Sequence, residues 1–118
     1  MIPYGRQDIS QEDINAVIDV LKSDFLTQGP VVPAFEAAVA KFCGATFAVA
    51  VNSATSALHL ACLALGVGKG DVVWTSPISF VASANCALYC GAAIDFIDID
   101  PVTCNMSVEH LANKLKRA

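Results

Sequence analysis

The residues best suited to chemistry form the stretch Asn52-Ser53-Ala54-Thr55-Ser56, in which amide and hydroxyl side chains surround one small residue. An apolar, β-branched run from Phe47 to Val51 precedes this stretch, and an uncharged helical run follows it. A turn at the start of a helix presents backbone N–H groups at the positive end of the helix dipole, which favours a phosphate. The pattern therefore predicts an anion site, although simple N-capping would equally explain Ser53 and Thr55.

The stretch matches neither of the common phosphate-binding motifs. The chain has no G-x-G-x-x-G after a strand-like run and no G-K-[ST] sequence. Gly66-Val67-Gly68-Lys69-Gly70 follows a helical run and precedes a strand-like run, which is the wrong order for cradling a phosphate. These glycines are typical of a helix end and a loop. A dinucleotide site and a P-loop are therefore disfavoured.

A second candidate is Ser76-Pro77-Ile78-Ser79-Phe80, which follows the next strand-like run. An aromatic ring at the start of a helix, beside a phosphate site, could stack on a flat heterocycle. Taken alone, Phe80 is more often a core residue.

Other residues that commonly serve as acids, bases or metal ligands lack a suggestive arrangement. Asp95, Asp98 and Asp100 could act as paired carboxylates or bind a cation, but carboxylates near a strand end are also ordinary turn formers. We expect structural roles for Asp95 and Asp100 and leave Asp98 open. The spacing implies no partner for His59 or His110, so neither is assigned a catalytic role.

The cysteines indicate a reducing compartment. Their number is odd, no C-x-x-C pair is present, and the N-terminal sequence MIPYGRQD lacks the apolar core of a signal peptide. We therefore expect a cytoplasmic protein. Cys86 and Cys90 share one helix face, but two thiols without a further ligand make a weak metal site, so no metal is expected. Cys86 and Cys90 are interpreted as small core residues. The chain's five cysteines are Cys43, Cys62, Cys86, Cys90 and Cys104.

Composition excludes several classes of protein. The chain has 118 residues, of which 55% are hydrophobic and 15% charged, so it is not disordered. Its net charge of -4 and the lack of a basic block disfavour nucleic acid as a partner. The uncharged segment from Val72 to Ile94 is long enough to span a membrane, but Pro77 and several polar residues interrupt it, so we reject that interpretation. So large an apolar fraction in a short chain suggests part of a larger protein.

The elements that must position the candidate residues follow from hydrophobic periodicity. Ser10 and Asp13 resemble a capping box before a helix over Gln11–Ser23, and a second helix is expected from about Pro33 to Gly44. Strands and helices then alternate; the expected strands are 47–51, 71–75 and 93–97, and the expected helices are 55–65, 78–89 and 108–116. This order predicts an α/β fold with a parallel or mixed sheet covered by helices on both faces. Ligands of such sheets bind beyond the carboxyl ends of the strands, where the candidate turns fall.

Three segments together resemble the N-terminal part of the DegT family of pyridoxal-phosphate-dependent sugar aminotransferases: LTQGPVVPAFEAAVAKFCGA, FAVAVNSATSALHLACLALGVGKGDVVWTSPISFVASAN and GAAIDFIDIDPVTCNMS. The resemblance implies the type I aminotransferase fold, a three-layer α/β domain with a mixed, mainly parallel sheet. Residues 1–32 would form an N-terminal helix and substrate-side loop. Residues 33–118 would form the first, incomplete part of the large domain that binds the cofactor.

The same resemblance implies the site. Backbone and hydroxyl groups of Ala54, Thr55 and Ser56 would hold the phosphate of pyridoxal 5'-phosphate, and Phe80 would stack on its pyridine ring. The substrate, a nucleotide-linked keto sugar, would bind at a homodimer interface. The residues that would line the substrate site are Tyr4, Phe25, Leu26, Thr27, Gln28 and Gly29.

The sequences SPISFVASAN and NSATSALHLA are similar to the branch that aminates a UDP-linked 4-keto-6-deoxy hexosamine for pseudaminic acid, with glutamate or glutamine as the amino donor. The family also needs a lysine that forms a Schiff base with the cofactor and an aspartate on its ring nitrogen. None of the chain's five lysines lies in a matching motif. The chain is therefore expected to be a truncated piece that is inactive alone. Two alternatives stay open: a sugar dehydratase on the same scaffold, and a non-catalytic anion-binding module.

Overall fold

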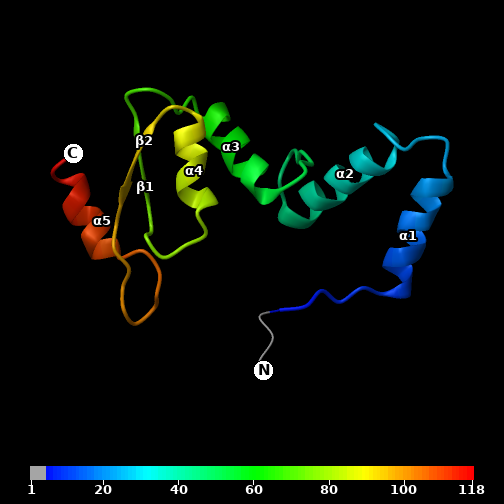
Figure 1. The fold of residues 1–118 in the computed structure, drawn as a ribbon, viewed down its shortest axis with the longest axis horizontal. Helices are drawn as coiled ribbons and strands as arrows, with labels where there is room; N and C mark the ends of the chain where they lie inside the picture. The colour runs from blue at the N-terminus through cyan, green and yellow to red at the C-terminus, as the bar shows by residue number, and fades with distance from the viewer. Residues whose placement is uncertain (1–4) are drawn as a thin grey trace. The chain divides into compact units, whose positions relative to one another are not determined.

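The structure is a computed structural model that describes residues 5–118 (Figure 1). These residues divide into two compact units, one ending at Ala50 and the other running from Val51 to Ala118. Each unit is described by itself. The expected functional division between residues 32 and 33 stays a prediction.

The first unit contains two helices, α1 (Gln11–Lys22) and α2 (Val31–Cys43). The predicted capping box at the start of α1 is confirmed, because the Ser10 hydroxyl accepts the Asp13 N–H at 3.2 Å and the Asp13 carboxylate accepts the Ser10 N–H at 2.8 Å. Helix α2 starts two residues before Pro33, which still lies in its first turn. Gly44 ends α2 as predicted, with φ of +66°, a conformation that glycine adopts without steric cost.

The expected strand over Phe47 to Val51 is wrong. Within residues 5–118, this segment has no strand partner, and Phe47 and Val49 are 85% and 77% exposed. A strand exists only when a neighbouring backbone supplies its hydrogen bonds, and an apolar run alone does not supply one. The segment is instead tied to α2, because the Glu36 carboxylate accepts the Ala50 N–H at 2.8 Å.

The second unit confirms the predicted α/β order from residue 54 onward. It contains α3 (Ala54–Ala64), β1 (Val72–Thr75), α4 (Ala82–Tyr89), β2 (Ala93–Phe96) and α5 (Val108–Leu115). Strands β1 and β2 are parallel, as expected when a helix connects them, and Trp74 pairs in register with Asp95. The described residues thus form a two-stranded part of the expected sheet.

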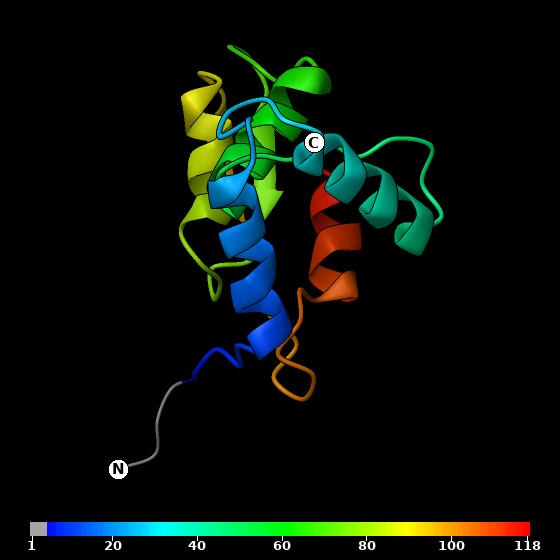
Figure 2. The same cartoon turned by 90° about the vertical axis from the view of Figure 1, so that its right-hand side faces the viewer.

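The helices of the second unit form layers around this sheet. Helix α4 packs on both strands, and α3 packs on the outer side of α4. Helix α5 lies on the opposite side of the sheet from α4 (Figure 1). Figure 2 gives the perpendicular view of these elements. The core lies where α4 meets the strands; its buried residues are Ala82, Cys86, Ala87, Ala92 and Ile97.

Helix α4 begins at Ala82, four residues later than predicted. The residues before it form a turn whose Val81 carbonyl accepts the N–H groups of Ala84 and Asn85 at 3.1 and 3.0 Å. Serine hydroxyls compete for local hydrogen bonds and so favour turns over helix. In this turn the Ser79 and Ser83 hydroxyls lie 3.1 Å apart. Phe80 therefore belongs to the connection before α4 and not to the helix.

Many apolar side chains remain exposed in the described residues. The apolar stripe of α1, whose periodicity predicted a buried face, is between 37% and 65% exposed; it consists of Ile14, Val17, Ile18 and Leu21. Among residues 5–118, none of the helices has both the length and the apolarity needed to cross a membrane.

Candidate functional site

Ser53 organises the start of α3. Its backbone is extended, with φ of -164° and ψ of 158°, and its hydroxyl accepts the Ser56 N–H at 3.2 Å. The Ser53 carbonyl accepts the first helical hydrogen bond, from Ala57 at 3.1 Å. The first turn of a helix has no intrahelical partners for its N–H groups. The Ser53 hydroxyl occupies only the Ser56 N–H. The N–H groups of Ala54 and Thr55 therefore remain available to an anion.

Side chains of this turn also bond to one another. The Ser56 hydroxyl donates to the Asn52 side-chain oxygen at 2.7 Å and lies 3.1 Å from the Ser53 hydroxyl. Thr55 is half-buried, and its hydroxyl makes no hydrogen bond within the part of the chain that the structure describes. The turn thus combines two backbone donors with one unengaged hydroxyl, and N-capping by Ser53 leaves these donors in place.

Phe80 lines a pocket of about 160 Å³ at the carboxyl end of β1. Phe80 is 75% exposed, so the alternative that it is a core residue does not hold in the described structure. The residues that line the pocket include both hydroxyl-bearing and aromatic side chains. Its lining comprises Thr75, Ser76, Pro77, Ser79, Phe80, Val81, Ser83, Ala84 and Phe96. An exposed ring beside polar groups can pack on a flat, polar heterocycle.

Ser76 is a further candidate residue, which the sequence places in the turn after β1 without distinguishing it from its neighbours. Its hydroxyl oxygen is buried and has no hydrogen-bond partner among the described residues. A buried hydroxyl without a partner is costly, so such an atom commonly marks the place of a ligand or water. The available sequence signal was its position directly after β1, where ligands of parallel sheets bind.

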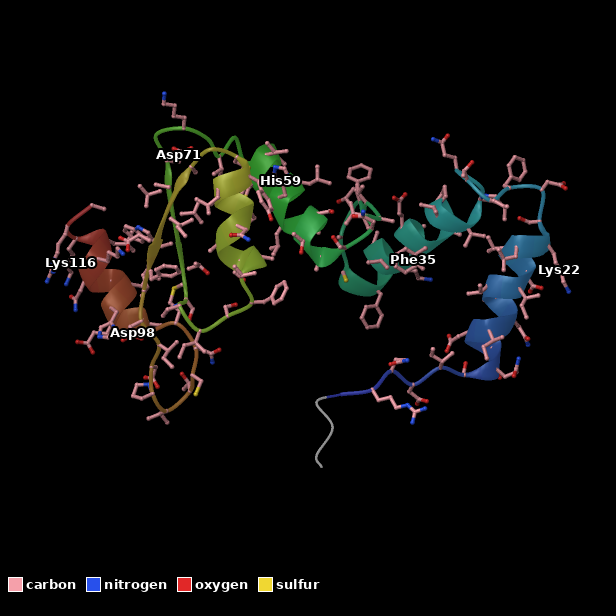
Figure 3. The ribbon with its side chains drawn as sticks, viewed as in Figure 1. Lys22, Phe35, His59, Asp71, Asp98 and Lys116 are labelled. Atoms are coloured by element: carbon pink, nitrogen blue, oxygen red, sulfur yellow. The ribbon has the colours of Figure 1, made fainter. Side chains whose placement is uncertain are left out.

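The three aspartates in and directly after β2 accept local hydrogen bonds or form an ion pair. Asp100 accepts the N–H groups of Val102 and Thr103 at 2.8 and 2.9 Å. These hydrogen bonds lower the pKa of Asp100, and the one from Thr103 has the larger effect. Asp95 forms an ion pair with Lys114, as expected of a structural residue. Asp98, labelled in Figure 3 just beyond β2, accepts the N–H of Ile99 at 2.8 Å. Residues 5–118 contain no group of three or more potential ligands that could hold a metal ion.

The histidines have no catalytic arrangement in the described structure. The His59 ring on α3 packs edge-on against Tyr89 on α4, with ring centres 5.3 Å apart. The backbone N–H of His110 is bound by the Ser107 hydroxyl at the start of α5. His59 therefore contributes to the packing of α3 on α4; the expectation that neither histidine is catalytic stays a prediction.

The residues of the predicted substrate loop, Phe25 to Gly29, belong to the first unit. The Ser23 hydroxyl donates to the Val20 carbonyl at 2.8 Å and accepts the Phe25 N–H at 3.3 Å, which fixes the start of the loop. A Cβ atom at Gly29 would lie 2.7 Å from the Phe25 Cβ, so the loop requires glycine there. Tyr4 lies outside the described residues. The substrate-binding role of these residues stays a prediction.

The structure therefore assembles the candidate site in part. Ala54, Thr55 and Ser56 share one helical turn, and Phe80 precedes the helix on which α3 packs. All four belong to the second unit. Their assignment to a cofactor is developed below as a proposal.

Two related proteins each align with most of the chain. A UDP-4-amino-4,6-dideoxy-N-acetyl-beta-L-altrosamine transaminase from Campylobacter jejuni is 50% identical over 99 residues, which are 84% of this chain and 26% of that protein. The spore coat polysaccharide biosynthesis protein SpsC of Bacillus subtilis is 47% identical over 105 residues, which are 89% of this chain and 27% of that protein. The chain thus spans about a quarter of the length of these relatives.

Solved structures agree in fold. Spr1654 from Streptococcus pneumoniae, described as a sugar aminotransferase and solved in its PLP form, matches with a TM-score of 0.89 and 32% identity over 95% of this chain and 29% of that one. Helicobacter pylori PseC, an aminotransferase of pseudaminic acid biosynthesis, matches with a TM-score of 0.87 and 36% identity over 94% of this chain and 30% of that one.

These likenesses confirm an α/β fold of the kind found in PLP aminotransferases. The family-level match extends over residues 7–118 and so includes the α3 turn and Phe80. The chain therefore belongs to the DegT/DnrJ/EryC1/StrS aminotransferase family.

Proposed function

We propose that this chain forms the part of a nucleotide-sugar aminotransferase that holds the phosphate and ring of pyridoxal 5'-phosphate. The observation that carries the proposal is the Ser53-capped start of α3, which leaves the Ala54 and Thr55 N–H groups without helical partners in a chain of this family. A site of this kind suits a phosphate because N–H groups and the helix dipole both favour negative charge.

The phosphate would accept hydrogen bonds from three groups of this turn. Two are the N–H groups of Ala54 and Thr55, and the third is the Thr55 hydroxyl. The Ser56 hydroxyl donates to Asn52 at 2.7 Å, so it would turn about its Cβ–Oγ bond to reach a phosphate. Asn52 and Ser53 then act by holding the turn in shape.

The ring would pack on Phe80, whose exposed face suits a planar heterocycle. The Ser76 hydroxyl, which is buried in the same pocket and has no hydrogen-bond partner in residues 5–118, offers a polar contact to a ligand bound there. These two residues and the α3 turn fit a molecule with a flat aromatic ring and an anionic arm.

Pyridoxal phosphate supplies a carbonyl that carries the amino group between substrates and a ring that withdraws electrons. The residues of this chain bind and orient it. Lys114 is engaged by Asp95 and the Phe96 carbonyl, so it does not suit a catalytic role. The remaining lysines are exposed; they are Lys22, Lys41, Lys69 and Lys116. We expect that this chain alone does not transfer amino groups.

The substrate we favour is a UDP-linked 4-keto-6-deoxy sugar, with glutamate as amino donor. The name of the Campylobacter relative, a transaminase of a UDP-linked amino sugar, supports the sugar class. We further propose that the enzyme is a cytoplasmic homodimer in which Phe25 to Gly29, with Tyr4, line the sugar site.

An isotope-transfer assay tests this function. The intact protein is incubated with pyridoxal phosphate, 15N-labelled glutamate and a UDP-linked 4-keto-6-deoxy-N-acetylhexosamine. The proposal predicts a 15N-amino sugar and an equal amount of 2-oxoglutarate, both measured by mass spectrometry. A sugar that loses water without gaining nitrogen would indicate a dehydratase, and an unchanged sugar would contradict the proposed substrate. The same sugar linked to dTDP serves as the control for nucleotide preference.

A further inference from the structure

Three cysteines meet where α3 packs on α4. The ring pair of His59 and Tyr89 sets how these helices face each other, with ring centres 5.3 Å apart and planes inclined by 62°. Cys62 lies one helical turn beyond His59 on α3. On α4, Cys86 lies three residues before Tyr89. Cys90 directly follows Tyr89 at the end of the helix. Cys86 and Cys90 are four residues apart and so share one helix face, and the three cysteines belong to the two helices that pack together, α3 and α4 with its C-cap.

The environment of the thiols agrees with this placement. Cys86 is only 5% exposed and donates its S–H to the Ser83 carbonyl at 3.4 Å, while Cys62 and Cys90 are half-buried. Burial raises the pKa of the Cys62 thiol, and interactions with the thiols of Cys86 and Cys90 raise it further. Cys62 thus lies near the thiols of Cys86 on α4 and of Cys90 at the end of α4.

The other two cysteines provide an internal comparison. Cys43 and Cys104 are exposed, and all five cysteines are in the thiol form in the structure. Exposure alone would make Cys43 and Cys104 the first to react with a small reagent. Only a thiol with a neighbouring thiol can go on to an intramolecular disulfide.

We propose that an oxidant induces a reversible disulfide between Cys62 on α3 and either Cys86 or Cys90 of the α4 segment. Cys62 is the cysteine common to both possible disulfides. This inference does not depend on the proposed function. The link would join the helix that begins at Ala54 to the helix that follows Phe80. It would therefore fix the packing of the two elements that present these residues.

The chemistry requires a disulfide oxidant, for which oxidised glutathione is sufficient. The Cys62 thiolate attacks one sulfur of the oxidant, forming a mixed disulfide and releasing one glutathione thiolate. A thiolate of α4 then attacks the Cys62 sulfur and releases the second glutathione thiolate. In sum, two protein thiols lose two protons and two electrons, and one glutathione disulfide is reduced to two thiols. The thiolate is the attacking form, so the raised pKa of Cys62 slows this first step at neutral pH.

Disulfide mapping tests the proposal. The intact, folded protein is treated with oxidised glutathione in mildly alkaline buffer, and free thiols are then blocked with N-ethylmaleimide. Digestion without reductant, followed by peptide fragmentation, identifies the linked residues. The expected product joins Cys62 to Cys86 or Cys90, is two hydrogens lighter than the reduced pair, and disappears with dithiothreitol. No such link, or a link from Cys62 to Cys43 or Cys104, would overturn the proposal.

Matched variants complete the test. Cys62→Ser should abolish the interhelical link, whereas Cys43→Ser and Cys104→Ser should form it as fully as the unmodified chain. Circular dichroism before oxidation confirms that each variant is folded, and Cys62→Ala provides a second substitution if the serine at this half-buried position disturbs folding. An α3–α4 link that persists without the Cys62 thiol would contradict its role as the common partner.

Discussion

Lys114 on α5 forms an ion pair with Asp95 on β2, and its ammonium group also donates to the Phe96 carbonyl at 2.9 Å. The same ammonium group lies 5.1 Å from the centre of the Trp74 ring on β1. Trp74 and Asp95 are register partners in parallel strands, so their side chains share one face of the sheet. Lys114 therefore ties α5 to both strands of the second unit.

The ion pair makes part of the stability dependent on pH. The hydrogen bond from Lys114, and next that from the Phe96 N–H, lower the pKa of Asp95. A carboxyl group with a lowered folded-state pKa stabilises the fold above its unfolded pKa, and this contribution disappears as the pH falls through the folded-state pKa. Asp95→Asn should therefore lower Tm at neutral pH and have much less effect at an acid pH at which Asp95 is protonated in the folded state.

Thermal unfolding of Asp95→Asn and of the exposed control Asp19→Asn, followed by circular dichroism at both pH values, measures this difference. An equal loss of Tm for Asp95→Asn at neutral and acid pH would contradict the assigned role of its charge.

Glu36 provides a second prediction because its carboxylate accepts the Ala50 N–H at 2.8 Å. Glu36→Ala removes the acceptor, while Glu36→Gln keeps a side-chain oxygen. A hydrogen bond to a charged group contributes about 1.5–3 kcal/mol. We expect faster hydrogen exchange at the Ala50 amide in Glu36→Ala and a smaller change in Glu36→Gln. If the Ala50 amide exchanged as slowly in both variants as in the wild type, this hydrogen bond would not hold the segment.

Gly29 is expected to control the shape of the predicted substrate loop. In Gly29→Ala, the new Cβ would meet Phe25 Cβ at 2.7 Å and the Phe25 carbonyl at 3.3 Å, so the loop must shift. The KM for the nucleotide sugar should rise while the affinity for pyridoxal phosphate stays unchanged. Gly5→Ala is the control, since its Cβ would meet no atom of the described residues within 4 Å. An unchanged KM in Gly29→Ala would show that this loop does not line the substrate site.

Phe80→Ala should weaken retention of pyridoxal phosphate in the intact protein, because it removes the exposed ring of the pocket. Ser79→Ala changes a neighbour whose hydroxyl lies 3.1 Å from that of Ser83, so it should have a much smaller effect. Cofactor absorbance after gel filtration measures retention. Equal retention in the wild type and both variants would exclude stacking on Phe80.

Local signals in the sequence predicted local structure well. The capping box of Ser10 and Asp13, the helix end at Gly44 and the N-cap at Ser53 each depend on residues a few positions apart. For the same reason the N-terminal turn of α3 could be recognised as a potential anion site before its geometry was seen. The order of strands and helices from Ala54 onward followed from periodicity.

Features that depend on distant residues could not be predicted. The apolar run from Phe47 to Val51 predicts a strand, but strand formation depends on a neighbouring backbone. The interaction of Lys114 with Asp95 and Trp74 joins three elements, and no sequence spacing encodes it. The unpartnered Ser76 hydroxyl likewise becomes visible only when burial is known.

The most direct test of the central claim removes a single backbone donor. Ala54 is the first residue of α3, a position where proline is compatible with a helix but lacks an N–H. The extended backbone of Ser53 suits a residue that precedes proline. Val108→Pro at the first position of α5, also preceded by an extended serine, is the matched control.

The measurement is the ratio of the affinities of the intact protein for pyridoxal phosphate and for pyridoxal, which lacks the phosphate. Fluorescence titration gives both Kd values. The account predicts that Ala54→Pro lowers this ratio by about tenfold, as expected for one lost hydrogen bond to a charged group, while Val108→Pro leaves it unchanged. An unchanged ratio in Ala54→Pro, or a wild type that binds both compounds equally, would contradict a phosphate site at the start of α3.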